Sequence, residues 1–179
     1  MRSPTSRLLV SMTVVFLALP AVFFPAGARA ERGASTAKER EKAIRLAREL
    51  EVEPFGQKAR DARRWLALWT VKVPDYRFQF CPEALGGTVA ARQRIRTEIL
   101  AQTSYSSLAF VLENPGQAGA PLDVHRAGVL GALRAYEVIV AKEPGTRSPL
   151  LDDLVAKRDA GEIDAHLAET VKACPVRKE

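Results

Sequence analysis

The chain has 179 residues, with 27 lysines and arginines against 21 aspartates and glutamates, which gives a formal net charge of +6. Residues 1–30 contain three arginines and no acid, so residues 31–179 have a net charge of only +3. A mild and mixed charge of this kind argues against a nucleic-acid partner, which would require concentrated positive charge. Removing 30 of the 179 residues leaves 149, the size of one ordinary domain.

Residues 1–30 have the pattern of a secretory signal peptide: a basic start, an apolar run over residues 8–24, and the small-x-small sequence Ala28-Arg29-Ala30. We therefore predict cleavage before Glu31 and an exported protein, periplasmic or secreted. The alternative is an uncleaved anchor, but the apolar run has 17 residues and contains Pro20, whereas a membrane span needs about 20 residues. In that alternative, this segment would be the contact of the protein with the membrane.

Residues 31–36 are predicted to be a flexible leader, and an all-helical domain is predicted over residues 37–179. The first helix begins at about Ala37 and ends near Glu53-Pro54, because the residue before a proline avoids the helical conformation. Charged residues cover most of this helix, which predicts a position on the surface of the domain. Its apolar face consists of Ala43, Leu46, Ala47 and Leu50.

A second helix is predicted over residues 57–73, and it carries both tryptophans of the chain, Trp65 and Trp69, on its apolar face. The other side carries three arginines, Arg60, Arg63 and Arg64. The tryptophans could form a stacking platform beside the arginines. They could also be core residues, with the arginines solvated and Asp61 as a local partner. The second interpretation is favoured, because large aromatic side chains dominate burial in small domains.

Residues 75–87 break the helical pattern. Tyr76, Phe78 and Phe80 alternate with polar residues, which is the period of a strand, but the sequence offers no second strand to pair with. We therefore predict a short extended arm whose aromatic side chains lie against the helices. Cys81 follows this arm directly.

Residues 123–142 are predicted to form the central helix of the domain, because they are apolar over most of the helix circumference. Bulky residues form a stripe, with small residues beside it where a second helix could come close. The stripe is Val129, Leu133, Tyr136 and Val140, and the small residues are Gly128, Gly131, Ala132 and Ala135. The preceding helix, predicted over residues 88–113, ends in Asn114-Pro115-Gly116, and the central helix ends in the similar Glu143-Pro144-Gly145. These matching ends predict that the two helices form a hairpin.

Two further helices are predicted at the end of the chain, one from Ser148-Pro149 to Gly161 and one over residues 162–174. Cys174 falls on the apolar face of the last helix. The chain has two cysteines, and an even count in an exported protein predicts a disulfide between Cys81 and Cys174. The alternative is two separate buried thiols. A disulfide would clamp the last helix to the end of the arm.

Residues that commonly carry chemistry are sparse. His125 lies at the edge of the central stripe, and we expect a half-buried, hydrogen-bonded side chain rather than a ligand or base. Glu162, His166 and Glu169 share one side of the last helix, but a metal site there would need carboxylates from other helices, so a charged outer face is favoured. The sequence contains no nucleophile elbow, C-x-x-C motif or glycine-rich phosphate loop. It therefore favours a non-catalytic protein without a cofactor or a metal.

The predicted fold is all-α: a single compact domain of five to six helices around residues 123–142, with a short extended arm. Grooves between helices can accept a helix or an extended segment, so the predicted function is binding of a protein or peptide partner. A chain rich in alanine and arginine with a single asparagine is typical of a GC-rich bacterial genome, which places that partner in the bacterial envelope. The candidate surface consists of His125, Trp65, Trp69, Tyr76, Arg60 and Arg64. The alternative is a small-molecule or metal-binding protein or enzyme with a cleft near His125 and Trp65/Trp69.

Overall fold

All regular structure in the described residues is helical, as predicted. The computed structural model describes residues 32–76, 81–85 and 97–174, and no strand occurs in these ranges. The α-helices of this part are α1 (Ala37–Val52), α2 (Gly56–Lys72), α4 (Thr97–Glu113), α5 (Pro121–Lys142), α6 (Pro149–Asp159) and α7 (Ile163–Thr170). Its short 3-10 helices are η1 (Pro82–Leu85), η2 (Pro115–Gln117), η3 (Pro144–Thr146) and η4 (Val171–Ala173). The predicted signal peptide, the arm residues 77–80 and the expected helix start at residue 88 lie outside the described residues.

Helices in the described part begin and end close to the residues that the sequence marks. The Thr36 hydroxyl accepts a hydrogen bond from the Glu39 N–H at 3.3 Å, and the Glu39 carboxylate accepts one from the Thr36 N–H at 2.9 Å, which caps α1. Gly56, at the start of α2, and Gly161, between α6 and α7, have φ values of 85° and 75°, a conformation that other residues avoid. α5 begins at Pro121, two residues before its predicted start, because proline fits the first turn of a helix.

Hydrogen bonds hold the last residues of the expected leader. Ser35 is buried, and its backbone N–H and hydroxyl donate to the Asp75 carboxylate just after α2, the hydroxyl at 2.6 Å. Arg40 of α1 donates to the Ser35 carbonyl at 2.6 Å. Desolvation raises the pKa of Asp75, but the hydrogen bonds from Ser35 outweigh it, so this pKa lies below its ordinary value. The segment before α1 is thereby fixed to the end of α2.

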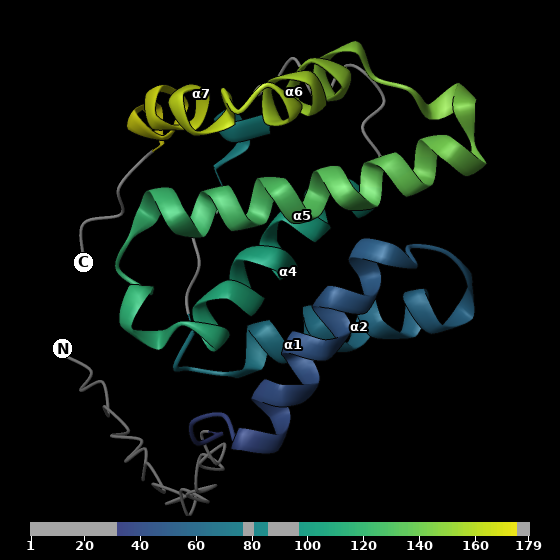
Figure 1. Ribbon diagram of the computed structural model, residues 1–179. Coiled ribbons are helices and arrows are strands. Elements are labelled where there is room, and N and C mark those ends of the chain that lie inside the picture. The colour runs from purple at the N-terminus through teal and green to yellow at the C-terminus, as the bar shows by residue number, and fades with distance from the viewer. Residues whose placement is uncertain (1–31, 77–80, 86–96, 175–179) are drawn as a thin grey trace, which may run out of the picture. The chain divides into compact units, whose positions relative to one another are not determined.

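α4 and α5 form the predicted hairpin, which is the most extensive helix–helix contact in the described part of the chain (Figure 1). Two glycines of α5 permit the close approach. A Cβ atom at Gly131 would lie 2.0 Å from Ser106 Oγ, and one at Gly128 would lie 2.3 Å from Ser107 Oγ. Ser107 also donates a hydrogen bond of 2.9 Å to the Val124 carbonyl. A larger residue at either glycine would force the two helices apart.

The buried apolar residues form two clusters. The α5–α7 cluster is Cys81, Ala84, Leu85, Ile99, Val129, Ala132, Leu133, Ala135, Tyr136, Ile139, Leu151, Leu154, Ile163 and Leu167. The α1–α2 cluster is Ala43, Ala47, Leu50, Ala59, Ala62, Leu66, Trp69, Val73, Tyr105, Leu108 and Ala109. In Figure 1, α6 and α7 cover α5 on one side, while α4 and α1 pack against it from the other, and α2 packs on α1. The predicted central helix therefore has packed neighbours on opposite sides.

A buried carboxylate joins α1 to the hairpin. The side chain of Glu51 is 5% exposed, and its Oε2 accepts hydrogen bonds from Arg134 of α5 at 2.7 and 2.9 Å. Its Oε1 accepts from Ser106 of α4 and from Arg48, each at 2.7 Å. Gln102 extends this network by donating to the Ser106 hydroxyl at 2.9 Å. α1 is therefore more central than the predicted surface helix, since it packs against α2, α4 and α5.

A tyrosine of α5 holds the start of α6. Ser148 is the N-cap residue, as predicted, but its side chain makes no capping hydrogen bond. Instead, its backbone N–H donates to the Tyr136 hydroxyl at 2.8 Å, and that hydroxyl donates to the Asp152 carboxylate at 2.9 Å. Burial raises the pKa of Tyr136, so this hydroxyl keeps its proton.

Candidate functional site

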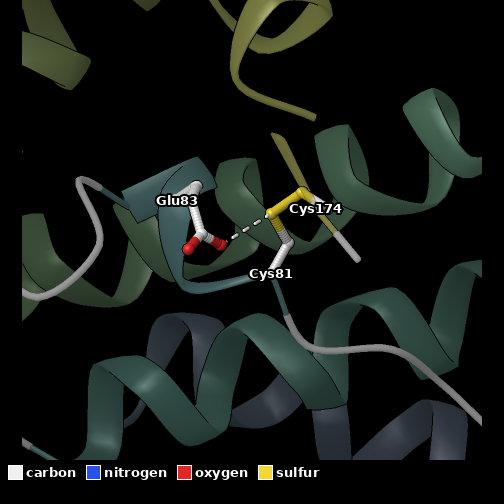
Figure 2. Close-up of side chains that lie close together, drawn as sticks. All are labelled: Cys81, Glu83 and Cys174. Atoms are coloured by element: carbon white, nitrogen blue, oxygen red, sulfur yellow. Dashed lines mark hydrogen bonds between the residues drawn. A yellow bond between two sulfur atoms is a disulfide. The ribbon is translucent and has the colours of Figure 1, made fainter. Parts of the chain in front are cut away.

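The structure places the two cysteines together. Cys81, just before η1, and Cys174, just after η4, are joined by a disulfide with their Cα atoms 5.5 Å apart (Figure 2). Cys81 is 1% exposed, whereas Cys174 is half-buried. The last α-helix ends at Thr170 instead of reaching Cys174, because the chain tightens into η4 first. The disulfide links the segment after the arm to the end of the helical chain.

Glu83 completes this group, which we call the cysteine cluster (Cys81, Glu83, Cys174). Figure 2 shows its carboxylate directed at the disulfide, with Oε2 3.5 Å from Cys81 Sγ. A disulfide sulfur carries no hydrogen, so this contact can be a hydrogen bond only when Cys81 is a thiol. The two sulfurs and the carboxylate oxygen lie within 4.8 Å of one another, the one group in the described residues close enough to share a metal ion.

Glu83 was not among the predicted site residues. Its position two residues after a cysteine, in a short turn, was the available signal. A single cysteine–acid pair of this kind suggests little until Cys174, 93 positions away, is known to lie beside it.

The outer face of α2, which we define as Arg60, Arg64, Leu68, Val71 and Lys72, is a second candidate site. Its apolar members are unusually accessible, because Leu68 is 51% exposed and Val71 is 86% exposed. Steps of four and three residues from Arg64 to Leu68 and Val71 place these side chains on one side of the helix. Leu68, Val71 and Lys72 were not among the predicted site residues, although their helical spacing from Arg64 was available in the sequence as a signal.

The basic residues of the α2 outer face form no ion pair with the described residues. Arg60 donates to the side-chain oxygen of Gln57 at 2.6 Å. Asp61, which was expected to pair with the arginines, instead accepts a hydrogen bond from Gln57 at 2.9 Å. The third predicted arginine, Arg63, is half-buried and donates to the Pro54 carbonyl at 2.7 Å. The positive charge of the α2 outer face is therefore available to a partner.

The aromatic residues of the predicted surface are largely packed. Trp69 is 4% exposed and stacks on half-buried Trp65, with ring centroids 5.6 Å apart. Tyr76, the arm aromatic that is described, has its ring centroid 6.2 Å from that of Trp69. Lys42 of α1 covers the ring of Trp65, with Nζ 4.4 Å from the ring centroid. The buried indole N–H of Trp69 has no hydrogen-bond acceptor in the described part.

His125 belongs to α5, whereas both tryptophans belong to α2. It is 6% exposed and precedes Val129 and Leu133 on one side of α5, and those two residues face the α5–α7 cluster. α2 and α5 are not among the helix pairs that pack extensively in the described residues, and a cleft shared by His125, Trp65 and Trp69 stays a prediction. Burial lowers the pKa of His125 below its ordinary value of 6.5, because a charged imidazolium is poorly solvated inside a protein.

A crevice of about 510 Å³ opens at the turn between α1 and α2. Its lining combines buried apolar residues, such as Leu50 and Ala59, with exposed charges of both signs, Glu53 and Lys58. This mixture favours no single class of ligand.

No family model, curated protein or solved structure matches this chain. Of the helices in the described ranges, none has the length and apolar character needed to cross a membrane. The cysteine cluster and the α2 outer face are therefore the two candidate functional sites in the described residues.

Proposed function

We propose that the protein is an exported, non-catalytic helical protein that binds an acidic segment of another protein through the α2 outer face. The observation that carries this proposal is the exposure of Leu68 and Val71 beside basic residues without ion pairs. This binding surface keeps Arg60 and Arg64 from the surface predicted from the sequence, and it adds Leu68, Val71 and Lys72 in place of the largely packed tryptophans.

The apolar members of the α2 outer face supply the reason for a partner. α2 packs on the domain through its other side, where Ala62, Leu66 and Trp69 are buried. Burying a valine or leucine side chain contributes about 1.5–3 kcal/mol, so two exposed ones on a single helix face favour a contact with another molecule.

The charge of α2 defines the kind of partner. The helix contains five basic residues and one acid, Asp61. A partner with glutamates or aspartates around a few apolar anchors would match this pattern, because complementary charge steers association and sets specificity. An anionic membrane would also attract the basic residues. However, helices that lie on membranes use a broad apolar face, whereas here Ala62, Leu66 and Trp69 of α2 are buried in the domain.

Export is part of the proposal. The signal-peptide pattern of residues 1–30 supports it, and the Cys81–Cys174 disulfide is compatible with an oxidising compartment such as the periplasm or the extracellular space.

The proposal is tested with two matched synthetic peptides that form amphipathic helices, one of glutamate and leucine, the other with lysine in place of each glutamate. Labelled peptides are titrated with the protein produced from the full-length chain, and fluorescence anisotropy reports binding. We expect the acidic peptide to bind, with affinity that falls in about 0.5 M salt, because screening weakens charge attraction. The lysine peptide should not bind.

Variants locate the contact. Val71→Glu should weaken binding of the acidic peptide at least about tenfold, by adding a repelling charge at the more exposed of the two apolar residues of the face. The double change Arg64→Glu and Lys72→Glu should transfer binding to the lysine peptide. Leu122→Glu is the matched control, because Leu122 is also exposed, at 37%, but lies on α5. Binding to anionic lipid vesicles without binding to the acidic peptide would contradict the proposal.

A further inference from the structure

The carboxylate of Glu83 has a position that the disulfide does not explain. It is half-buried, and its Oε2 points at Cys81 Sγ from 3.5 Å (Figure 2). In the disulfide this sulfur has no hydrogen to donate, so the carboxylate gains no hydrogen bond from the contact. The side chain is not engaged in an ion pair with a described residue either. Water can solvate the exposed part of this carboxylate, whereas a thiol proton on Cys81 or a cation shared with the sulfur would give it a direct partner on the sulfur side.

The distances suit a small metal ion. In a tetrahedral zinc site with Zn–S of about 2.3 Å and Zn–O of about 2.0 Å, neighbouring sulfur and oxygen ligands lie about 3.5 Å apart. The distance between Glu83 Oε2 and Cys81 Sγ has this value, and Cys174 Sγ lies within 4.8 Å of both. After reduction, the two sulfurs would have to move apart to a ligand spacing, and the Cα atoms of the two cysteines are 5.5 Å apart.

The surroundings also define the type of site. Cys81 and Glu83 belong to the segment of η1, and Cys174 comes from the other end of the described chain, so the domain fold holds the ligands together. Cys81 is fully buried, while Cys174 is half-buried and leaves one side of the group open. Three protein ligands with an open fourth position leave room for water or an external ligand.

We infer that, when Cys81 and Cys174 are reduced, the cysteine cluster binds one borderline-soft divalent cation of the zinc type, with both thiolates and the Glu83 carboxylate as ligands. Two sulfurs and one oxygen favour zinc over magnesium or calcium, which prefer oxygen ligands alone. The disulfide and the metal exclude each other, because each uses both sulfurs. The cluster is thus a site whose occupancy depends on the thiol–disulfide state of the protein.

The chemistry balances with a dithiol as the reductant. A dithiol thiolate attacks Cys174 Sγ, the more accessible sulfur, and the bond between Cys174 and Cys81 breaks. The dithiol loses two electrons and two protons and becomes a disulfide, while each cysteine sulfur gains one proton. Binding of the zinc ion then releases those two protons, because the ligands are thiolates.

The test uses protein produced from the full-length chain, reduced with a dithiol and freed from it without oxygen. Cobalt(II) and zinc(II) are titrated separately, with absorption of the thiolate–cobalt bond and native mass spectrometry as readouts. We expect one ion per reduced chain and no ion on the disulfide form. Zinc should also slow re-formation of the disulfide by a mild oxidant, since both sulfurs are then occupied.

Glu83→Gln keeps both cysteines and removes the charged ligand, so it should weaken zinc binding at least about tenfold, as even loss of an outer-shell partner does. Glu162→Gln is the matched control, because Glu162 is an exposed acid outside the cluster, and it should bind zinc normally. A Glu83→Gln protein with unchanged affinity would exclude Glu83 as a ligand and overturn the proposed site.

Circular dichroism shows whether the reduced protein unfolds, because it measures the helix content. Zinc added during reduction should then retain or restore the helical signal, because the ion replaces the covalent link between η1 and the end of the chain. A reduced protein that binds no ion, whether folded or unfolded, would overturn the inference. Neither outcome depends on peptide binding at the α2 outer face, so the two proposals fail separately.

Discussion

The two hydrophobic clusters bury helix faces in different ways. The α1–α2 cluster contains five alanines among its 11 buried members, so its helices can approach closely but each contact removes little apolar surface from water. The α5–α7 cluster contains three alanines among 14 and is built mainly from leucine, isoleucine and valine. It alone includes a member of the disulfide, Cys81. The first cluster leaves one side of α2 accessible, while the second surrounds α5.

This difference suggests that stability depends mainly on one cluster and partner binding on the other. Large side chains and a covalent link concentrate stability around α5, α6 and α7. The thinner α1–α2 side carries the exposed leucine and valine residues that the proposed partner would cover. Experiments that weaken one cluster at a time can establish whether stability and binding are divided in this way.

The largest effect is expected from removing the disulfide in metal-free buffer. Replacing Cys81 and Cys174 together by serine should lower the free energy of unfolding by about 4.5 kcal/mol, because the bond closes a loop of roughly 90 residues in the unfolded chain. Urea unfolding followed by circular dichroism measures this loss. A reductant should change the parent protein by a similar amount and leave the double variant unchanged. A loss below about 1 kcal/mol would show that the α5–α7 cluster holds without its covalent link.

A somewhat smaller effect is expected at the crossing of α4 and α5. Gly131→Ala should lower the free energy of unfolding by about 3 kcal/mol, since the added Cβ would lie 2.0 Å from Ser106 Oγ and 2.6 Å from the buried Glu51 carboxylate. Gly145→Ala is the control, because a Cβ there meets nothing within 4 Å. Equal unfolding curves for the two variants would mean that the hairpin can separate at little cost.

A pH effect is expected from His125. Burial places its pKa in the folded protein below the ordinary value of 6.5, so the unfolded chain takes up a proton first as the pH falls. The stability associated with the neutral ring is therefore complete above pH 6.5 and is lost as the pH falls through the folded pKa. His125→Gln should reduce the slope of unfolding free energy against pH between about pH 7 and pH 5. An unchanged slope would show that the ring is solvated in the folded protein.

The smallest effect on stability is expected on the α2 outer face. Leu68→Ser and Val71→Ser should each change the free energy of unfolding by less than about 0.5 kcal/mol, because both side chains are exposed. The same variants should weaken binding of the acidic peptide. Leu66→Ser is the contrasting control, because Leu66 is fully buried on the inner side of the same helix and its loss should unfold the α1–α2 cluster. A large loss of stability in Val71→Ser would show that this face is already packed.

Much of the fold could be predicted because its signals are local. Proline and glycine mark the ends of α1, α4 and α5, and the apolar circumference of residues 123–142 identifies the central helix. The burial of Glu51 could not be predicted in this way. Its partner Arg134 lies 83 positions away, and a glutamate in a charged helix resembles a solvated one until the second helix is in place.

The candidate sites show the same limit. The pairing of the cysteines was predicted from their number and the expected export of the protein, whereas the position of Glu83 beside Cys81 Sγ depends on the folded structure. His125 and the tryptophans, which the alternative hypothesis combines in one cleft, come from two helices, α5 and α2, that do not pack extensively against each other in the described residues. The exposed pair Leu68 and Val71 was open to prediction, because their spacing from Arg64 already follows one helix face.

The disulfide also determines what a single cut in the chain can do. Its two cysteines are 93 positions apart, so α4, α5, α6 and α7 lie within one covalent ring. Cleavage at an exposed turn inside the ring, at Gly116 or Gly145, would open the ring without releasing a fragment. The nicked molecule would migrate as one species on a gel until a reductant divided it into two chains. One cut inside the ring would thus leave every described helix covalently attached to the rest of the molecule.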